Sequence, residues 1–159
     1  MIWGWMNMSL IAFPAAIFYI CGGLSSGLRL FGTEQNWRPP RNLGLILGFI
    51  GLALHGLVLY ADLFIEGGLN LSFFNAVSLA AWTVAGLLLI SALTKPVENL
   101  AILALPIAAI TVLLELRFPG SRLLDEGSGW ELRVHVLTSM LAYSLLTLAS
   151  AQAILTAIQ

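Results

Sequence analysis

Two histidines, His55 and His135, are the residues of this sequence best suited to chemistry, because each lies inside a long apolar segment. An ionisable side chain is costly in such a segment and is a functional candidate for that reason. Glu115 is a third candidate of this kind, and Asp62 and Arg133 lie where apolar segments end or begin. Histidine titrates near neutral pH and is a common metal ligand, so the two histidines point to proton or metal chemistry.

His55 shares one helix face with three glycines and an acidic residue, because positions three and four residues apart lie on the same side of a helix. This stripe consists of Gly44, Gly48, Gly51, His55 and Asp62. Small residues on a membrane helix mark where another helix approaches closely. We therefore expect His55 to point into a helix bundle, either as a ligand or proton carrier or as a structural partner of a neighbouring helix.

His135 lies near the start of the last apolar segment, again on a face of small residues. The members of this face are Glu131, Ser139, Ala142, Ala149 and Ala153. The face predicts an inward position, although a histidine near a helix end can also reach the lipid headgroups. Two neutral imidazoles at similar depth can ligate one haem iron axially, so His55 and His135 together predict a haem site. They make a poor zinc site, because no cysteine or third ligand accompanies them.

Three further residues are candidates for contacts to such a haem. Trp82 could stack on a flat cofactor, although its helix face is more typical of helix packing. Arg133 could bind a haem propionate or a lipid phosphate. Glu115 is interpreted first as an interfacial charge paired with Arg117 or Arg122, with a propionate or proton role as the alternative.

The composition excludes most other classes of protein. The chain has 159 residues, of which 59% are hydrophobic and 9% charged, and its mean hydropathy is +0.94. A soluble domain carries about 25% charged residues, and a disordered chain is less hydrophobic. A net charge of −1 leaves no basic patch for nucleic acid, and the single cysteine, Cys21, excludes a disulfide framework or a CxxC site. The motifs GxSxG, HExxH, GxGxxG and the Walker loop are missing, so we expect no enzymatic turnover.

Five segments are long and apolar enough to cross a membrane as helices, which requires about 20 mostly apolar residues each. The predicted spans are residues 8–31, 43–62, 75–94, 100–118 and 132–158. The connections between them are short. Residues 1–159 are therefore expected to form a single transmembrane domain of the all-α class, a polytopic helix bundle in contact with the lipid bilayer.

Basic residues set the expected orientation. Arg38 and Arg41 lie in the first connection, which the positive-inside rule places in the cytoplasm. The N-terminus and the connections 63–74 and 119–131 then face outward, toward the periplasm of a Gram-negative cell. No Lys or Arg follows Arg133, although a helix that ends in the cytoplasm usually has basic flanks. This favours the hypothesis that the chain is the N-terminal part of a longer bundle.

Three segments carry a family resemblance. Residues 130–143, WELRVHVLTSMLAY, resemble the W-x-x-x-x-H-V-x-x-S/M-x-x-x-Y pattern of the cytochrome c assembly membrane proteins, and of their HemX-like and YpjD-like inner-membrane branch. Residues 70–79, NLSFFNAVSL, resemble the N-L-S-x-x-N-x-x-S-L stretch that opens the third helix of the YpjD-like proteins. His55-Gly56 resembles the second-helix histidine of that branch. The resemblance extends from about residue 44 to the end.

The resemblance implies binding or delivery of haem in support of c-type cytochrome assembly in the bacterial cytoplasmic membrane. In the family, the histidine that matches His135 lies at the outer membrane face and is implicated in haem binding. Together with the placement of the histidines, this favours haem b held between the second and fifth spans by His55 and His135. Covalent attachment would then belong to other cytochrome c maturation proteins.

The sequence also departs from the family. It lacks the WWD motif of the haem-synthase members and the histidine that follows that motif, and it has fewer spans than family members usually have. Two alternatives therefore remain beside the haem hypothesis. One is a non-haem structural subunit of a membrane complex, and the other, a lesser hypothesis, is a small transporter.

Overall fold

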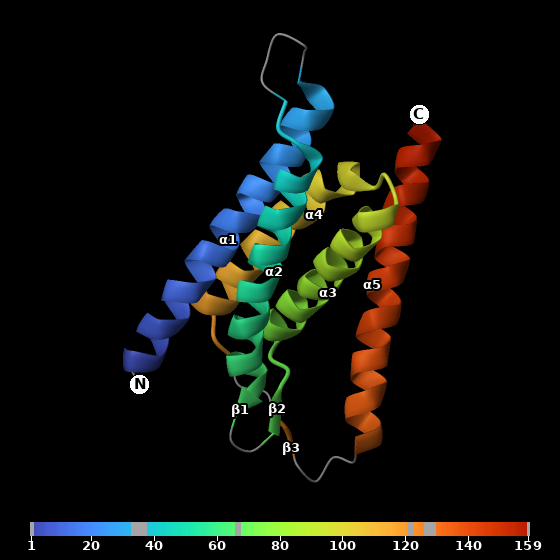
Figure 1. Ribbon diagram of the computed structural model, residues 1–159. Coiled ribbons are helices and arrows are strands. Elements are labelled where there is room, and N and C mark those ends of the chain that lie inside the picture. The colour runs from blue at the N-terminus through green and yellow to red at the C-terminus, as the bar shows by residue number, and fades with distance from the viewer. Residues whose placement is uncertain (1, 33–37, 66–67, 121–122, 126–129, 159) are drawn as a thin grey trace.

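Five helices dominate the computed structural model, which describes residues 2–32, 38–65, 68–120, 123–125 and 130–158. The helices are α1 (Ile2–Phe31), α2 (Arg41–Leu63), α3 (Phe73–Thr94), α4 (Glu98–Arg117) and α5 (Trp130–Ile158) (Figure 1). Each contains a stretch that is long and apolar enough to cross a membrane. The predicted all-α bundle of five spans is confirmed, and the chain has the architecture of a multi-pass membrane protein.

Helices α2 to α5 begin and end within two residues of the predicted spans. The exception is α1, which begins at Ile2 rather than at residue 8. The helix extends to Ile2 because no proline before Pro14 interrupts it. Proline inside α1 and α4 does not end either helix, as is common for membrane helices, where neighbouring groups compensate for the missing backbone hydrogen bond.

The packed part of the bundle consists of the first four helices. α1 lies against α2 and α4, and α3 lies against the same two helices. The core between them consists mostly of small and medium side chains, among them Ala12, Ala16, Ala85, Ala108 and Val112. Small side chains let helix backbones approach closely, which favours van der Waals packing where lipid gives no hydrophobic drive for association.

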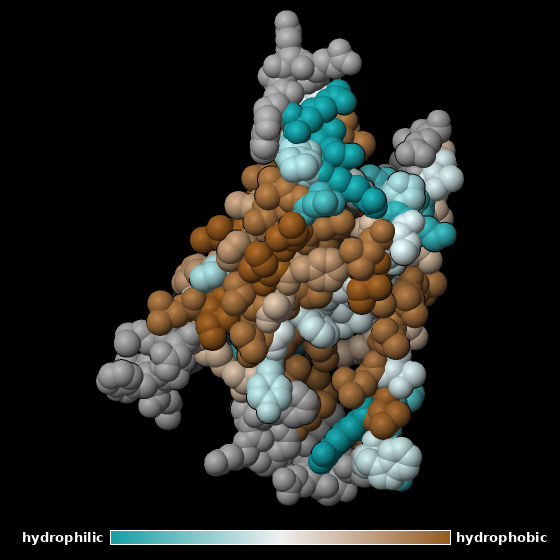
Figure 2. Space-filling model, viewed as in Figure 1, coloured by the Kyte–Doolittle hydropathy of each residue, from teal (hydrophilic) through white to brown (hydrophobic). Residues whose placement is uncertain are grey.

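Large apolar side chains also cover the outside of the bundle. Leu10, Phe31, Leu103 and Leu146 are each more than 60% exposed. Figure 2 shows hydrophobic residues across the middle of the visible face and hydrophilic residues toward its two ends. This distribution is the one expected of helices whose outer faces contact lipid acyl chains.

A small antiparallel sheet closes one end of the bundle, and the sequence did not predict it. Its strands are β1 (Phe64–Ile65), β2 (Gly68–Asn70) and β3 (Leu123–Asp125), in the order β1-β2-β3. The Asn70 amide donates a hydrogen bond to the Gly120 carbonyl at 2.9 Å, and the Asn75 amide donates to the Asn70 carbonyl at 3.3 Å. The connection between α2 and α3 and the connection between α4 and α5 are thus joined at the end that holds the start of both α1 and α5 (Figure 1).

Arg41 closes the opposite end of the helix pair α2 and α3. Its guanidinium Nη2 donates to the Ala92 carbonyl at 2.5 Å and to the Lys95 carbonyl at 3.4 Å. The last carbonyls of a helix have no partner within the helix, so Arg41 satisfies the end of α3. One of the two arginines used to predict the orientation therefore also has a structural role.

α5 stands apart from the other helices. Only 6% of its apolar stretch is buried, against 28–44% for the other four spans, and it packs mainly against α3. Its contacts with the core come from Leu148 and Ala151, in its second half. The first half of α5, which carries His135, is therefore largely uncovered by the described part of the chain.

Candidate functional site

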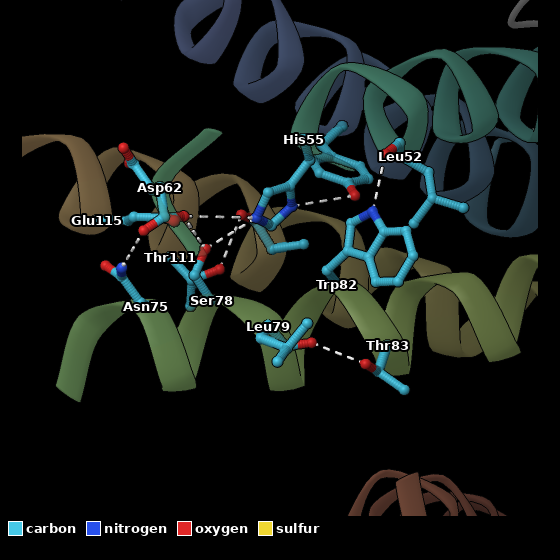
Figure 3. Close-up of polar contacts among 12 residues, drawn as sticks. Leu52, His55, Asp62, Asn75, Ser78, Leu79, Trp82, Thr83, Thr111 and Glu115 are labelled. Carbon is cyan, nitrogen blue, oxygen red and sulfur yellow. Dashed lines mark hydrogen bonds and ion pairs between the residues drawn. The ribbon is translucent and has the colours of Figure 1, made fainter. Parts of the chain in front are cut away.

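Four polar side chains, one from each of α1 to α4, form a continuous hydrogen-bonded chain inside the bundle, and Figure 3 shows His55, Ser78 and Glu115 of this chain. His55 is at its centre and is 0% exposed. Its Nδ1 lies 3.3 Å from the Tyr19 hydroxyl, and its Nε2 lies 2.8 Å from Ser78 Oγ. Ser78 in turn donates to Glu115 Oε2 at 2.5 Å. We call Tyr19, His55, Ser78 and Glu115 the four-helix polar chain.

The proton positions along this chain follow from its donors and acceptors. Because Ser78 uses its one hydroxyl hydrogen to donate to Glu115, its oxygen must accept a hydrogen bond from His55 Nε2–H. A neutral imidazole carries one N–H, so Nδ1 is then the acceptor for the Tyr19 hydroxyl. All three hydrogen bonds run in one direction, from α1 to α4, and both ring nitrogens of His55 are engaged.

The glycine stripe of α2 explains how His55 reaches this position. A Cβ on Gly51 would lie 2.9 Å from the Tyr19 ring, and a Cβ on Gly44 would lie 3.3 Å from the Gly22 carbonyl of α1. The imidazole meets the Tyr19 ring edge-on, with ring centroids 5.8 Å apart. The expectation that the stripe faces another helix and turns His55 inward is confirmed. Asp62, at the end of the stripe, is half-buried.

Glu115 is not the interfacial charge that we predicted first. Its side chain is 1% exposed and its Oε2 accepts from Ser78, so it belongs to the interior. Arg117 instead places its guanidinium over the Phe118 ring, 5.3 Å from the centroid. Arg122, the other expected partner, lies outside the described residues. Glu115 Oε1 is also buried and has no hydrogen-bond partner in the described part of the chain.

The structure does not place His135 in the interior. His135 is exposed, as are Glu131, Ala142 and Ala149 of its predicted inward face. α5 instead turns a different face toward α3, on which Ser144 is buried. The predicted inward position of His135 is therefore wrong. Its imidazole has no hydrogen-bond or ion-pair partner among the residues described.

These positions decide how well the two histidines fit a haem. A ligating imidazole must direct a free nitrogen lone pair at the iron. His55 does not meet this condition, because Tyr19 and Ser78 occupy both of its nitrogens and its side chain is enclosed. His135 does meet it, because its ring is exposed and unpartnered. Among the described residues, no cluster of three or more His, Cys, Asp or Glu side chains could hold a metal ion.

Trp82 and Arg133, the two residues expected to lie beside the haem, differ in their contacts and burial. The Trp82 indole N–H donates to the Leu52 carbonyl at 2.9 Å, and its ring packs against Gly56, where a Cβ would lie 3.3 Å away. The hollow beside it has a volume of about 170 Å³, less than the roughly 300 Å³ at the lower end of ligand pockets. Trp82 thus packs α3 on α2. Arg133 is half-buried, and its Nε lacks a partner in the described ranges.

Trp82→Phe is expected to lower the free energy of unfolding by about 1 kcal/mol, because it removes the bond to the Leu52 carbonyl and keeps most of the ring packing. Trp130→Phe is the matched control, since Trp130 is 70% exposed at the start of α5 and should change stability by less than about 0.5 kcal/mol. Unfolding in mixed micelles, followed by circular dichroism, measures both. Equal stabilities of the two variants would contradict the packing role of Trp82.

In comparisons with known proteins, no protein-family model, no curated protein and no solved structure matches this chain. The resemblance to the cytochrome c assembly proteins therefore rests on the motifs in residues 54–57, 70–79 and 130–143 alone.

Proposed function

We propose that this chain is a haem-handling protein of the bacterial cytoplasmic membrane, which supports the assembly of c-type cytochromes and leaves covalent attachment to partner proteins. The observation that supports it is the exposed, unpartnered imidazole of His135 on a helix that the rest of the bundle leaves largely uncovered. An axial ligand of haem needs a free nitrogen and space beside it. His135 also lies in the segment with the longest motif resemblance.

In this proposal the two histidines have different roles. His135 is the haem ligand, and His55 holds the four-helix polar chain together and does not ligate. Any further ligand to the iron would come from a partner of the maturation machinery. Haem iron would supply coordination and redox chemistry, while this chain would hold and orient the group. With Arg38 and Arg41 in the cytoplasm, His135 would face the outer side of the membrane.

Haem supplementation of the purified full chain tests the proposal. Reduced-minus-oxidised absorption spectra of the wild-type protein should show a haem band, and His135→Ala should remove it. His55→Ala should keep the band wherever circular dichroism shows that the variant is folded, because His55 is not a ligand in this proposal. A wild-type protein without a haem band would contradict the proposal, as would a band that survives in His135→Ala.

A structural subunit of a membrane complex is the second candidate, and the four-helix polar chain is the observation that favours it. The four-helix polar chain joins α1, α2, α3 and α4 through three buried hydrogen bonds, and such a rigid bundle suits a scaffold protein. This candidate predicts no haem band in any variant. It also predicts that partner proteins co-purify with the wild-type chain through the uncovered face of α5.

A further inference from the structure

The carboxyl group of Glu115 is buried and only half satisfied. Oε2 accepts from Ser78 at 2.5 Å, but the equally buried Oε1 has no partner among the described residues. Buried polar atoms without a partner are rare and call for an explanation, such as a catalytic role or a bound water or ion. A charged carboxylate is also costly within a membrane. This cost favours the neutral carboxylic acid, and Oε1, which no donor among the described residues engages, is the oxygen that can carry the proton.

Among the described residues, the groups around Glu115 do not supply a permanent positive charge. α1 contributes the Tyr19 hydroxyl through His55, and α3 contributes Ser78 and, nearby, the uncharged Asn75. On α2, His55 Nε2 lies 3.9 Å from Glu115 Oε2, and its hydrogen bonds are complete with a neutral ring. Arg117, on α4 itself, is directed at Phe118.

The remaining neighbour, Asp62 of α2, repels a negative charge on Glu115. The two carboxyl groups interact electrostatically, and Figure 3 shows Asp62 in the same cluster as Glu115. Asp62 is half-buried in the last turn of α2, which leads into β1 at the end closed by the sheet. A proton on Glu115 would remove this repulsion and the cost of the buried charge together.

We propose that Glu115 is an intramembrane proton-binding site, which a proton reaches from the sheet end of the bundle past Asp62. The proton binds Oε1 and converts the carboxylate to a neutral carboxylic acid, while Oε2 still accepts from Ser78. No other group gains or loses a proton. This inference goes beyond haem handling and does not depend on it.

The four-helix polar chain would transmit the protonation state of Glu115 to His55. Hydrogen bonds to a charged acceptor are shorter and stronger than those to a neutral one. Ser78 therefore donates more strongly to an ionised Glu115, and its oxygen becomes a better acceptor for His55 Nε2–H. Proton binding would weaken both bonds and would be detectable at the imidazole, although the imidazole itself stays neutral.

Infrared spectroscopy of the full chain in nanodiscs tests the site directly. As the pH is lowered, the carbonyl stretching band of a protonated carboxyl group shielded from water should appear, at a higher frequency than the bands of the exposed acids, and it should vanish reversibly as the pH is raised. Glu115→Gln should abolish this band. Glu131→Gln is the matched control and should leave it unchanged, because Glu131 is exposed on α5. The survival of this high-frequency band in Glu115→Gln would overturn the proposal, as would a wild-type protein without the band.

A second measurement keeps the test valid if Glu115→Gln fails to fold. The chain has two histidines, so nitrogen-15 spectra of labelled His135→Asn report on His55 alone. We expect one neutral tautomer with the proton on Nε2, and a change in its chemical shift at the midpoint of the carboxyl band. A His55 signal that stays constant while the band titrates would overturn the coupling through Ser78. The opposite tautomer would contradict the direction assigned to the polar chain.

Discussion

His55→Ala is expected to lower the free energy of unfolding by about 3 kcal/mol, whereas His135→Ala should change it by less than about 0.5 kcal/mol. The buried imidazole fills space between three helices, and its removal leaves a cavity. It also leaves the Tyr19 hydroxyl and Ser78 Oγ each without one hydrogen-bond partner. In membrane bundles each such bond contributes about 0.6–2 kcal/mol.

The two histidines form a matched pair for this measurement, because the same truncation is made at 0% exposure and on an exposed helix face. Reversible unfolding in mixed micelles gives both free energies under one set of conditions. His55→Gln is a useful intermediate, since an amide can replace one of the two hydrogen bonds and should recover part of the loss. Equal effects of His55→Ala and His135→Ala would show that the polar chain does not stabilise the bundle.

The position of His55 was predictable because its own helix carries the signal. Glycines three and four residues apart define the close face of α2, and His55 continues that face. Glu115 gave no comparable signal, because Ser78, its neighbour in the polar chain, lies on another helix. Its place near Arg117 in the sequence suggested a surface charge, whereas the rotation of α4 in the bundle turns the two side chains in different directions.

The rotation of α5 was not predictable for a related reason. Small residues occur on more than one side of this helix, so the face of His135 and the face of Ser144 and Ala151 are both plausible interfaces in sequence. Similar depth in the membrane also says nothing about rotation around the helix axis. The axial pairing of His55 and His135 depended on depth and on both faces pointing inward, and only the first face does so.

The sheet was not predicted because its strands are too short to show an alternation of polar and apolar residues. β1 has two residues, and β2 and β3 have three each, so pairing between distant connections is what defines them. Asn70 and Asn75 contribute by tying the connections to the start of α3. These two asparagines belong to the motif in residues 70–79, so that part of the family resemblance coincides with a structural role.

Gly51→Ala is expected to destabilise the protein by about 1–3 kcal/mol relative to Gly27→Ala. A Cβ at Gly51 would lie 2.9 Å from the Tyr19 ring and 3.2 Å from the Ala15 carbonyl, so α1 and α2 must separate or Tyr19 must turn. A Cβ at Gly27 would meet nothing closer than 3.9 Å. Both substitutions gain up to about 1 kcal/mol of helix propensity, so their difference isolates the packing of the two helices.

The same variant also tests whether the glycine stripe positions the polar chain. If Tyr19 turns away, its hydroxyl leaves His55 Nδ1, and the nitrogen-15 shift of His55 should change in Gly51→Ala but not in Gly27→Ala. A loss of stability without a change at His55 would mean that the helices separate without disturbing the hydrogen bond. Equal stability of the two variants would contradict close packing at Gly51, and with it the reason that His55 is enclosed and unavailable to a haem.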